Sequence, residues 1–364
     1  MKDEHSAQQP ILPGPGSALP PVTNPPHCEH TRLKFRGTLA AVCLLALSFF
    51  VAAPAPAALF TDLLVFGDSL SDHGNDLNFT TYPKAPGYSD GRFSNGPLWV
   101  ERLGTLLGLG APTSSRGGGK DFAYGGVTTG AGTTQLNSYY PLGPDYSAPN
   151  IGKQVTDWTS ANTAAGSQLF TMLGGGNDFF AVLDNGAATT AQSVADNMKS
   201  NIQALYDDGA RNVLALNLPD LGKTPRYRGT AKAAQATKLT TDYNAALTLN
   251  LNALKQADAG LNIYALDLFG LLNDVIANPA TYGLANVTDR AYTGDDSFAG
   301  NGTAVADPSK YLFWDAVHPT TAAHTLIGNA AFSLVPEPGS ALLFLFFGLL
   351  FGCVRASRAQ RRAA

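Results

Sequence analysis

Residues 59–69 read LFTDLLVFGDS, an apolar run that ends at Gly67 and is followed at once by Asp68 and Ser69. A short apolar run bounded by glycine is typical of a strand buried in a parallel sheet. Three further runs of this kind predict strands at 168–173, 212–218 and 262–266. Apolar residues at helical spacing predict helices at 94–107, 191–208, 231–257 and 319–332. In the last of these helices Pro319 suits the first turn. Strands that alternate with helices imply an α/β fold, in which a parallel sheet is covered by helices on both faces.

The composition is that of a folded, mildly acidic protein. The chain has 364 residues, of which 45% are hydrophobic and 14% are charged, so it can bury a large core. The formal net charge is −4 at pH 7, and no basic run occurs away from the two ends. We therefore expect no nucleic-acid partner.

The first 57 residues have the order of a secretory signal. Three basic residues, Arg32, Lys34 and Arg36, precede an apolar run at 38–53 and a stretch of small residues at 54–58. A buried or membrane-spanning helix is the alternative, but the run is shorter than the roughly 20 residues that a span needs. We predict that residues 1–57 are a leader and signal peptide, and that the protein is exported.

The last residues resemble a second sorting signal. Pro336-Glu337-Pro338 leads into an apolar run at 341–354, which four arginines follow at 355, 358, 361 and 362. Basic residues after an apolar segment hold it in a membrane with the positive end inside. The pattern resembles the PEP-CTERM sorting signal of Gram-negative bacteria. The resemblance implies transient association with the inner membrane, removal of the tail at 336–364 by an exosortase, and delivery to the cell surface, the matrix or the medium. A permanent single-span anchor is the alternative.

The stretch between these ends, residues 58–335, has the size of one large α/β domain. It contains 16 Lys and Arg against 24 Asp and Glu, so its net charge is −8. All three cysteines, Cys28, Cys43 and Cys353, lie outside it. A cysteine nucleophile and a cysteine metal site are therefore excluded for the domain, which suits an oxidising compartment.

Polar residues gather where the predicted strands end. In open parallel sheets, ligands bind at the carboxyl ends of the strands. Three such ends, and one loop close to the C-terminus of the domain, carry unusual polar sequences: 67–72 (GDSLSD), 174–178 (GGGND), 217–222 (NLPDLG) and 314–319 (WDAVHP). These four segments are the candidate site loops.

A hydrolytic serine needs a nearby base, which is usually histidine. The domain contains three histidines. His73 follows Ser69 closely and reads as a loop residue or a substrate contact, whereas His324 lies among alanines and reads as a packed helix residue. His318 follows Asp315 by three residues, a spacing that lets the carboxylate turn back onto one ring nitrogen and leave the other to accept a proton. By itself this spacing is weak evidence of a catalytic pair.

An acyl-transfer site also needs hydrogen-bond donors for an oxyanion. The Asn177 amide follows three glycines, where a backbone can approach a ligand closely. Segment 122–127 (FAYGGV) offers a backbone N–H with no side chain in the way. An ordinary turn explains either segment alone, because Gly, Asn and Asp are common turn residues.

Taken together and in this order, the blocks resemble the GDSL esterase/lipase family, whose members are also called SGNH hydrolases. Segments 91–96 (GRFSNG) and 217–225 (NLPDLGKTP) look like the family's secreted branch of phospholipases, lecithinases and hemolysins. One departure is His73, where the family usually has threonine. The resemblance spans residues 63–332 and implies a flavodoxin-like three-layer α/β/α sandwich with a central parallel sheet.

The resemblance also implies roles for individual residues. Ser69 would be the nucleophile, His318 the general base and acid, and Asp315 the residue that orients His318. The oxyanion hole would consist of the Ser69 N–H, the Gly126 N–H and the Asn177 side chain, with Gly125 as an alternative to Gly126. No metal or other cofactor is implied.

The predicted activity is that of a secreted serine esterase or lipase that hydrolyses carboxylic esters through an acyl-enzyme, with a lipid or another acyl ester as substrate. Two alternatives remain open: an acyltransferase, and an idle surface or matrix protein that acts by adhesion. The Gly/Ser/Thr-rich loop at 108–151 contains four tyrosines and is a candidate wall for the acyl or sugar part of the substrate, or else a solvated loop: Tyr124, Tyr139, Tyr140 and Tyr146.

Overall fold

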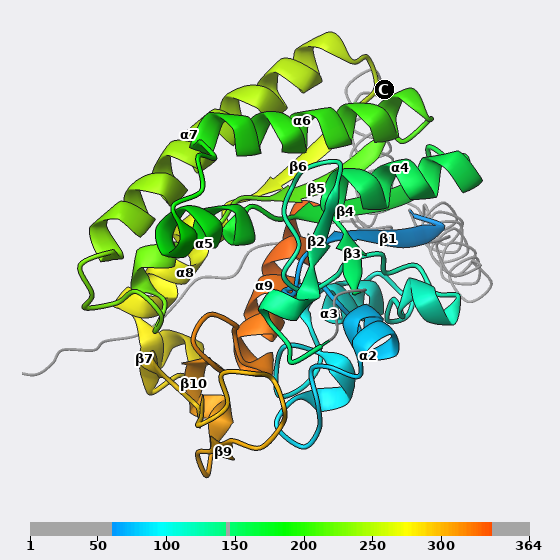
Figure 1. The fold of residues 1–364 in the computed structure, drawn as a ribbon. Coiled ribbons are helices and arrows are strands. Elements are labelled where there is room, and N and C mark those ends of the chain that lie inside the picture. Colours follow the sequence, from blue (N-terminus) through cyan, green and yellow to red (C-terminus); the bar gives the residue numbers. More distant parts are fainter. Residues whose placement is uncertain (1–59, 143–145, 337–364) are drawn as a thin grey trace, which may run out of the picture. The chain divides into compact units, whose positions relative to one another are not determined.

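The computed structural model describes residues 60–142 and 146–336 (Figure 1). The predicted leader and signal peptide at 1–57 lie outside the described residues, as do the apolar run at 341–354 and the arginines that follow it. In the described parts of the chain, no helix combines the length and the apolar character that a membrane crossing requires.

A parallel sheet forms the centre of the domain. Its strands are β1 (Asp62–Gly67), β4 (Gln168–Leu173), β5 (Asn212–Leu216) and β6 (Asn262–Leu266), in the spatial order β1-β4-β5-β6. All neighbouring pairs are parallel. The predicted strands are confirmed, and for β4 and β6 the predicted bounds are those of the structure. β5 ends two residues earlier than predicted, because the chain turns into a site loop at Asn217.

Residues 120–124 run along the free edge of β1. The Val65 N–H donates to the Lys120 carbonyl at 3.0 Å, and the N–H groups of Phe122 and Tyr124 donate to Val65 and Gly67 at 2.8 and 3.2 Å. With this segment included, the strand order by position in the chain is 2-1-3-4-5, which is the flavodoxin-like order. The order in which successive strands are added to the sheet reverses between β1 and β4, and at this switch point such sheets bind ligands.

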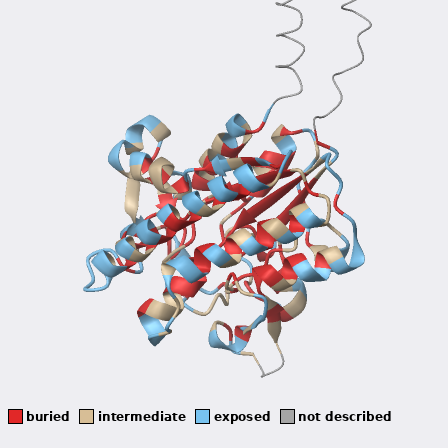
Figure 2. Ribbon diagram, turned by 90° about the horizontal axis from the view of Figure 1, so that it is seen from above, coloured by how far each residue is buried: buried red, intermediate tan, exposed pale blue. Residues whose placement is uncertain are grey.

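Helices cover both faces of the sheet (Figure 1). On one face α6 (Ala191–Asp207) packs against both α4 (Ile151–Ala161) and α7 (Ala233–Ala257); on the other, α3 (Trp99–Leu106) packs against α9 (Thr321–Leu334). Strands β1, β4 and β5 are buried between them and β6 is buried in part, whereas the outer faces of the helices are exposed (Figure 2). The predicted three-layer α/β/α sandwich is therefore confirmed.

Three predicted helices begin later than their sequence pattern suggests, among them α7, which starts at Ala233 rather than at 231. Helix α3 starts at Trp99 rather than at 94, because Pro97 disfavours helical backbone in the residue before it. Helix α9 starts at Thr321, after the Thr320 hydroxyl accepts the Ala323 N–H at 3.3 Å as an N-cap. Pro319 consequently lies before the cap and not in the first turn.

The structure also contains short elements that the sequence pattern did not reveal. The helices are α2 (Asn75–Thr80), α5 (Gly176–Asn185) and α8 (Leu268–Ala277), together with α4, which was not predicted either. The strands form three small pairs: β2 (Thr133–Gln135) with β3 (Ser147–Pro149), β7 (Asn286–Arg290) with β10 (Tyr311–Phe313), and β8 (Tyr292–Thr293) with β9 (Thr303–Ala304). Single 3-10 turns lie at 89–91, 115–117, 136–138, 221–223, 279–282 and 308–310. The loop predicted from residue 108 onward is thus irregular but not without structure.

Candidate active site

The candidate site lies at the carboxyl ends of β1 and β4, where the order of strand addition reverses. Ser69 follows β1 by two residues, and Asn177 lies in the first turn of α5, directly after β4. The loop at 314–319 reaches the same place from β10. Segments that are far apart in the sequence therefore meet here, as the strand-end argument predicts.

Ser69, His318 and Asp315 form a continuous hydrogen-bonded chain. The Ser69 Oγ lies 2.8 Å from His318 Nε2, and His318 Nδ1 lies 2.7 Å from Asp315 Oδ2. All three side chains are largely buried, with 9%, 4% and 5% of their surface exposed. A carboxylate on Nδ1 holds the proton at that nitrogen, so Nε2 is left to accept the serine proton.

Local backbone geometry explains why the Asp-x-x-His spacing closes. Asp315 Oδ1 accepts the N–H groups of Val317 and His318 at 3.0 and 2.8 Å, which bends the chain back onto the carboxylate. Burial alone would raise the pKa of Asp315, but the His318 ring and these N–H donors outweigh it and lower the pKa below its usual value. Asp315 therefore stays ionised and stabilises a protonated His318.

Tyr88 is a contact of this site that sequence reasoning missed. Its hydroxyl donates to Asp315 Oδ2 at 3.0 Å, and its ring is fully buried. It comes from the loop before α3, 227 residues away in the sequence, and belongs to none of the motifs. No local signal could have identified it, because only the fold brings Tyr88 to the carboxylate.

Of the candidate oxyanion donors, Asn177 lines the same pocket as Ser69. Asn177 is 7% exposed, and its Nδ2 donates to the Val127 carbonyl at 2.9 Å, which holds the amide in place. The Gly125 N–H donates to the Asp72 carboxylate at 3.1 Å and is thus already used. Within the described residues the N–H groups of Ser69 and Gly126 have no acceptor. This difference favours Gly126 over Gly125 as a donor to a bound oxygen.

Gly126 also has a conformation that favours glycine. Its φ is +72°, and a Cβ at this position would lie 2.7 Å from the Tyr139 ring. Tyr139 therefore packs against the backbone that would face the oxyanion. A side chain here would displace either that ring or the turn.

Two buried carboxyl groups lie directly beside Ser69 and Asn177 in the sequence. Burial raises the pKa of both Asp68 and Asp178 to about 6. The Asp68 carboxylate accepts the Leu70 N–H at 3.0 Å, and Asp178 accepts both the N–H and the hydroxyl of Thr129 at 3.1 Å. These hydrogen bonds hold the turns that carry Ser69 and Asn177. Within the described ranges, no group of three or more His, Cys, Asp or Glu side chains could hold a metal ion.

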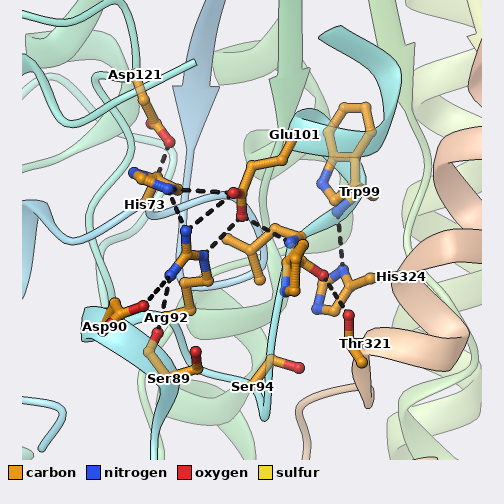
Figure 3. A network of polar contacts seen from close by, with 12 residues as sticks. His73, Ser89, Asp90, Arg92, Ser94, Trp99, Glu101, Asp121, Thr321 and His324 are labelled. Atoms are coloured by element: carbon orange, nitrogen blue, oxygen red, sulfur yellow. Dashed lines mark hydrogen bonds and ion pairs between the residues drawn. The ribbon is translucent and has the colours of Figure 1, made fainter. Parts of the chain in front are cut away.

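The other two histidines of the domain belong to a packing network (Figure 3). Arg92 Nε and Nη2 donate to the two Glu101 oxygens at 2.7 and 3.0 Å, and the His73 ring contacts both residues. Burial alone would raise the pKa of Glu101, but hydrogen bonds from His73 and Arg92 outweigh it and lower the pKa to about 2. On α9, His324 is buried, as predicted, and its Nδ1 accepts the Trp99 N–H at 3.3 Å. Burial lowers the pKa of His324 to about 3, so its ring is neutral.

An apolar pocket opens at Ser69, His318 and Asn177. Its empty volume is about 720 Å³, part of which is open to solvent. Its apolar lining comes mainly from α5, the loop after β5 and α8: Phe180, Leu218, Leu221, Leu268, Leu272 and Ile276.

The candidate wall of four tyrosines does not line this pocket. The Tyr140 hydroxyl instead donates to the buried Asp76 carboxylate at 2.5 Å, and Tyr139 packs beside Gly126. The prediction that loop 108–151 walls the acyl part of the substrate is therefore wrong for this pocket, and a wall for a sugar part stays a prediction. Sequence pattern could not reveal the true wall, since apolar residues of a pocket and of a core look alike in sequence.

A flavodoxin-like sheet with Ser69, Asn177 and His318 at its point of reversal has the architecture of an SGNH-type hydrolase. A family model described as GDSL-like Lipase/Acylhydrolase matches residues 63–331. The chain belongs to this family, and by that membership its domain is a hydrolase acting on esters.

Individual relatives are consistent with this assignment. The esterase EstA of Pseudomonas aeruginosa is 31% identical over 370 residues, which cover 89% of this chain and 54% of that protein. A phosphatidylcholine-sterol acyltransferase of Aeromonas hydrophila is 28% identical, over 81% of this chain and 96% of that protein. The chain spans about half the length of the Pseudomonas relatives that it matches.

Solved structures match less closely. The carbohydrate acetylesterase Est24 of Sinorhizobium meliloti has a TM-score of 0.42 at 14% identity, over 75% of this chain and 96% of that one. A catalytic mutant of Axe2, an acetylxylan esterase of Geobacillus stearothermophilus, has a TM-score of 0.41 at 13% identity, over 74% of this chain and 91% of that one.

Proposed function

We propose that the protein is an exported serine esterase that cleaves carboxylic esters of apolar acyl groups. The observation that carries this proposal is the hydrogen-bonded chain from Ser69 through His318 to Asp315, which opens into an apolar pocket. A hydroxyl bonded to a histidine that a buried carboxylate orients is the arrangement of an activated nucleophile.

The proposed reaction proceeds in two steps. Ser69 Oγ attacks the ester carbonyl while His318 Nε2 takes its proton, and the negative charge that develops on the carbonyl oxygen is stabilised by the N–H groups of Ser69 and Gly126 and by Asn177. His318 then donates the proton to the departing alcohol, which leaves an acyl group on Ser69. In the second step His318 activates a water that releases the acid.

The pocket indicates the kind of acyl group. Its lining is apolar, and burying one CH₂ group contributes about 0.8 kcal/mol, which corresponds to about a fourfold gain in kcat/KM. We expect the full-length chain to hydrolyse p-nitrophenyl esters with kcat/KM rising by about this factor for each added CH₂ until the pocket is full. A preference for acetate over longer acyl groups would contradict the assignment and would favour short esters such as acetylated sugars.

Asn177→Ala tests the oxyanion assignment. Removing one donor of an oxyanion hole typically lowers turnover by about 10²–10³. We expect this loss in kcat, with little change in KM, because the amide would act on the charge that develops during the reaction. Steady-state kinetics with p-nitrophenyl hexanoate measures the effect, and circular dichroism checks that the variant is folded. Full activity in a folded variant would remove Asn177 from the site.

An acyltransferase is the second candidate. The Aeromonas relative, a phosphatidylcholine-sterol acyltransferase, aligns along 96% of its length. The difference between the two activities is which acceptor reaches the acyl-enzyme, water or an alcohol. Competition between water and an added sterol or sugar alcohol, followed by mass spectrometry of the products, distinguishes them.

We also propose that the protein is exported and passes through the inner membrane with a tail that an exosortase removes. The support is the order of residues in the sequence: basic residues, an apolar run and small residues before 58, and Pro-Glu-Pro, an apolar run and arginines after 335. The intact mass of protein recovered from the medium of a Gram-negative host would show whether both ends are removed.

A further inference from the structure

Four basic residues follow β5 without forming a continuous run, which is why the composition alone gave no sign of them. They are Lys223, Arg226, Arg228 and Lys232, and residues 221–232 contain no acidic residue. The domain as a whole is acidic, with 16 basic against 24 acidic residues between 58 and 335. A local excess of positive charge in an acidic domain attracts anions to one place.

Arg226 does not itself line the pocket that contains Ser69, but it contacts Phe180, which does. Its N–H donates to the Ala316 carbonyl at 2.9 Å, inside the loop between Asp315 and His318. Its guanidinium carbon lies 5.0 Å from the centre of the Phe180 ring, and Phe180 lines the pocket. The cation is thus attached both to the catalytic loop and to the pocket wall.

Arg226 and Lys232 share a single carboxylate. Arg226 Nε and Nη2 donate to Asp184 Oδ2 at 3.1 and 2.6 Å, and Lys232 Nζ donates to Oδ1 at 2.7 Å. Their side chains are 41% and 46% exposed, whereas that of Asp184 is 23% exposed. The Arg226 Nη1 donates to no atom of the described residues. One of the two positive charges is therefore not neutralised, and the Nη1 side of the Arg226 guanidinium has no partner among the described residues.

If these ion pairs served only to hold the segment after β5 against α5, one cation on Asp184 would be enough, and here there are two. We infer that Arg226 and Lys232 form a subsite for an anionic group, a phosphate or a carboxylate, carried by the alcohol part of the ester. The pocket wall is mainly apolar and suits the acyl chain, so we assign the charged group to the alcohol part of the ester. Guanidinium binds such oxygens in a fixed fork geometry. The inference rests on the proposed esterase function and narrows its substrates to amphiphilic esters with an anionic head.

The test compares two chromogenic esters with the full-length chain. Both are octanoates of the same nitrophenol, one with a carboxylate on the ring and the other with a carboxamide at the same position. We expect Arg226→Gln to lower the ratio of kcat/KM for the charged over the neutral ester by about tenfold, mainly through KM. Arg226→Lys should restore part of the ratio. Asp184→Asn should raise it, because both cations lose their carboxylate.

Lys238→Gln is the matched control. Lys238 also has a carboxylate partner, Asp242, but it is 74% exposed on α7, and this ion pair lies within its own helix, away from Phe180 and the loop between Asp315 and His318. The ratio should stay unchanged in this variant. Inorganic phosphate and dihexanoyl phosphatidylglycerol, each added as a competitor of the charged ester, distinguish binding of a free anion from binding of a lipid head group.

The possible outcomes separate the two proposals. An unchanged ratio in Arg226→Gln, in a chain that still hydrolyses the neutral ester, would overturn the subsite and leave the esterase function intact. An equal fall in Lys238→Gln would also overturn it, because overall charge would then explain the effect. If the wild-type chain hydrolyses neither ester, both proposals fail. Should Arg226→Gln not fold, the opposite shifts expected of Arg226→Lys and Asp184→Asn decide the question.

Discussion

Ser69→Ala is expected to lower kcat for p-nitrophenyl hexanoate by about 10⁶, the loss that removal of a nucleophilic serine causes in a comparable hydrolase. The physical reason is that Ser69 Oγ is the atom hydrogen-bonded to His318 Nε2 at 2.8 Å. Without it, no acyl-enzyme can form, and only binding and the oxyanion donors remain. Stopped assays at high enzyme concentration would measure the residual rate.

A serine-directed fluorophosphonate supplies an independent readout. The wild-type chain should gain the mass of one covalent adduct, and Ser69→Ala should gain none. Ser71→Ala is the matched control in the same loop: the Ser71 Oγ accepts the Trp99 Nε1–H at 3.1 Å and is not in the Ser69–His318 chain. This variant should be less stable but still form the adduct. An adduct on folded Ser69→Ala would place the nucleophile elsewhere.

Asp315→Asn is expected to lower kcat by about 10⁴ while leaving the fold intact. Both Asp315 oxygens accept hydrogen bonds, from the His318 ring, from two backbone N–H groups and from Tyr88. An amide oxygen can accept the backbone bonds, but its NH₂ group would then face Nδ1 and move the ring proton to Nε2. The nitrogen that must accept the Ser69 proton would no longer be able to do so.

Asp307→Asn is a suitable control for this substitution. Asp307 is exposed and accepts the Ser309 N–H at 3.1 Å, a bond that an asparagine oxygen can replace. Its kcat and melting temperature should match those of the wild type. Activity of Asp315→Asn within tenfold of wild type would mean that another group orients His318.

The sequence predicts all four strands of the central sheet but only some of the helices that connect them. β4 and β6 have the predicted bounds because each is a short apolar run that stops where the polar site loop or the next helix begins. The helices α5 and α8 were not predicted. Helix α5 starts within the GGGND motif, which alone looks like a turn, and α8 (LFGLLNDVIA) is a mostly apolar run of 10 residues, too short to be told from a strand by periodicity alone.

The sequence by itself determined the α/β class and the family, because buried parallel strands need continuous apolar runs and the family blocks follow one another in order. Only the tertiary structure decided which residues surround the site. It brings Tyr88 to Asp315 and uses the Gly125 N–H on Asp72, so that the Gly126 N–H has no protein acceptor in the described part of the chain. It also builds the pocket wall from α5 and α8 and not from the tyrosine-rich loop. These contacts join residues that are far apart in the chain, and local pattern carries no information about which distant residues will meet.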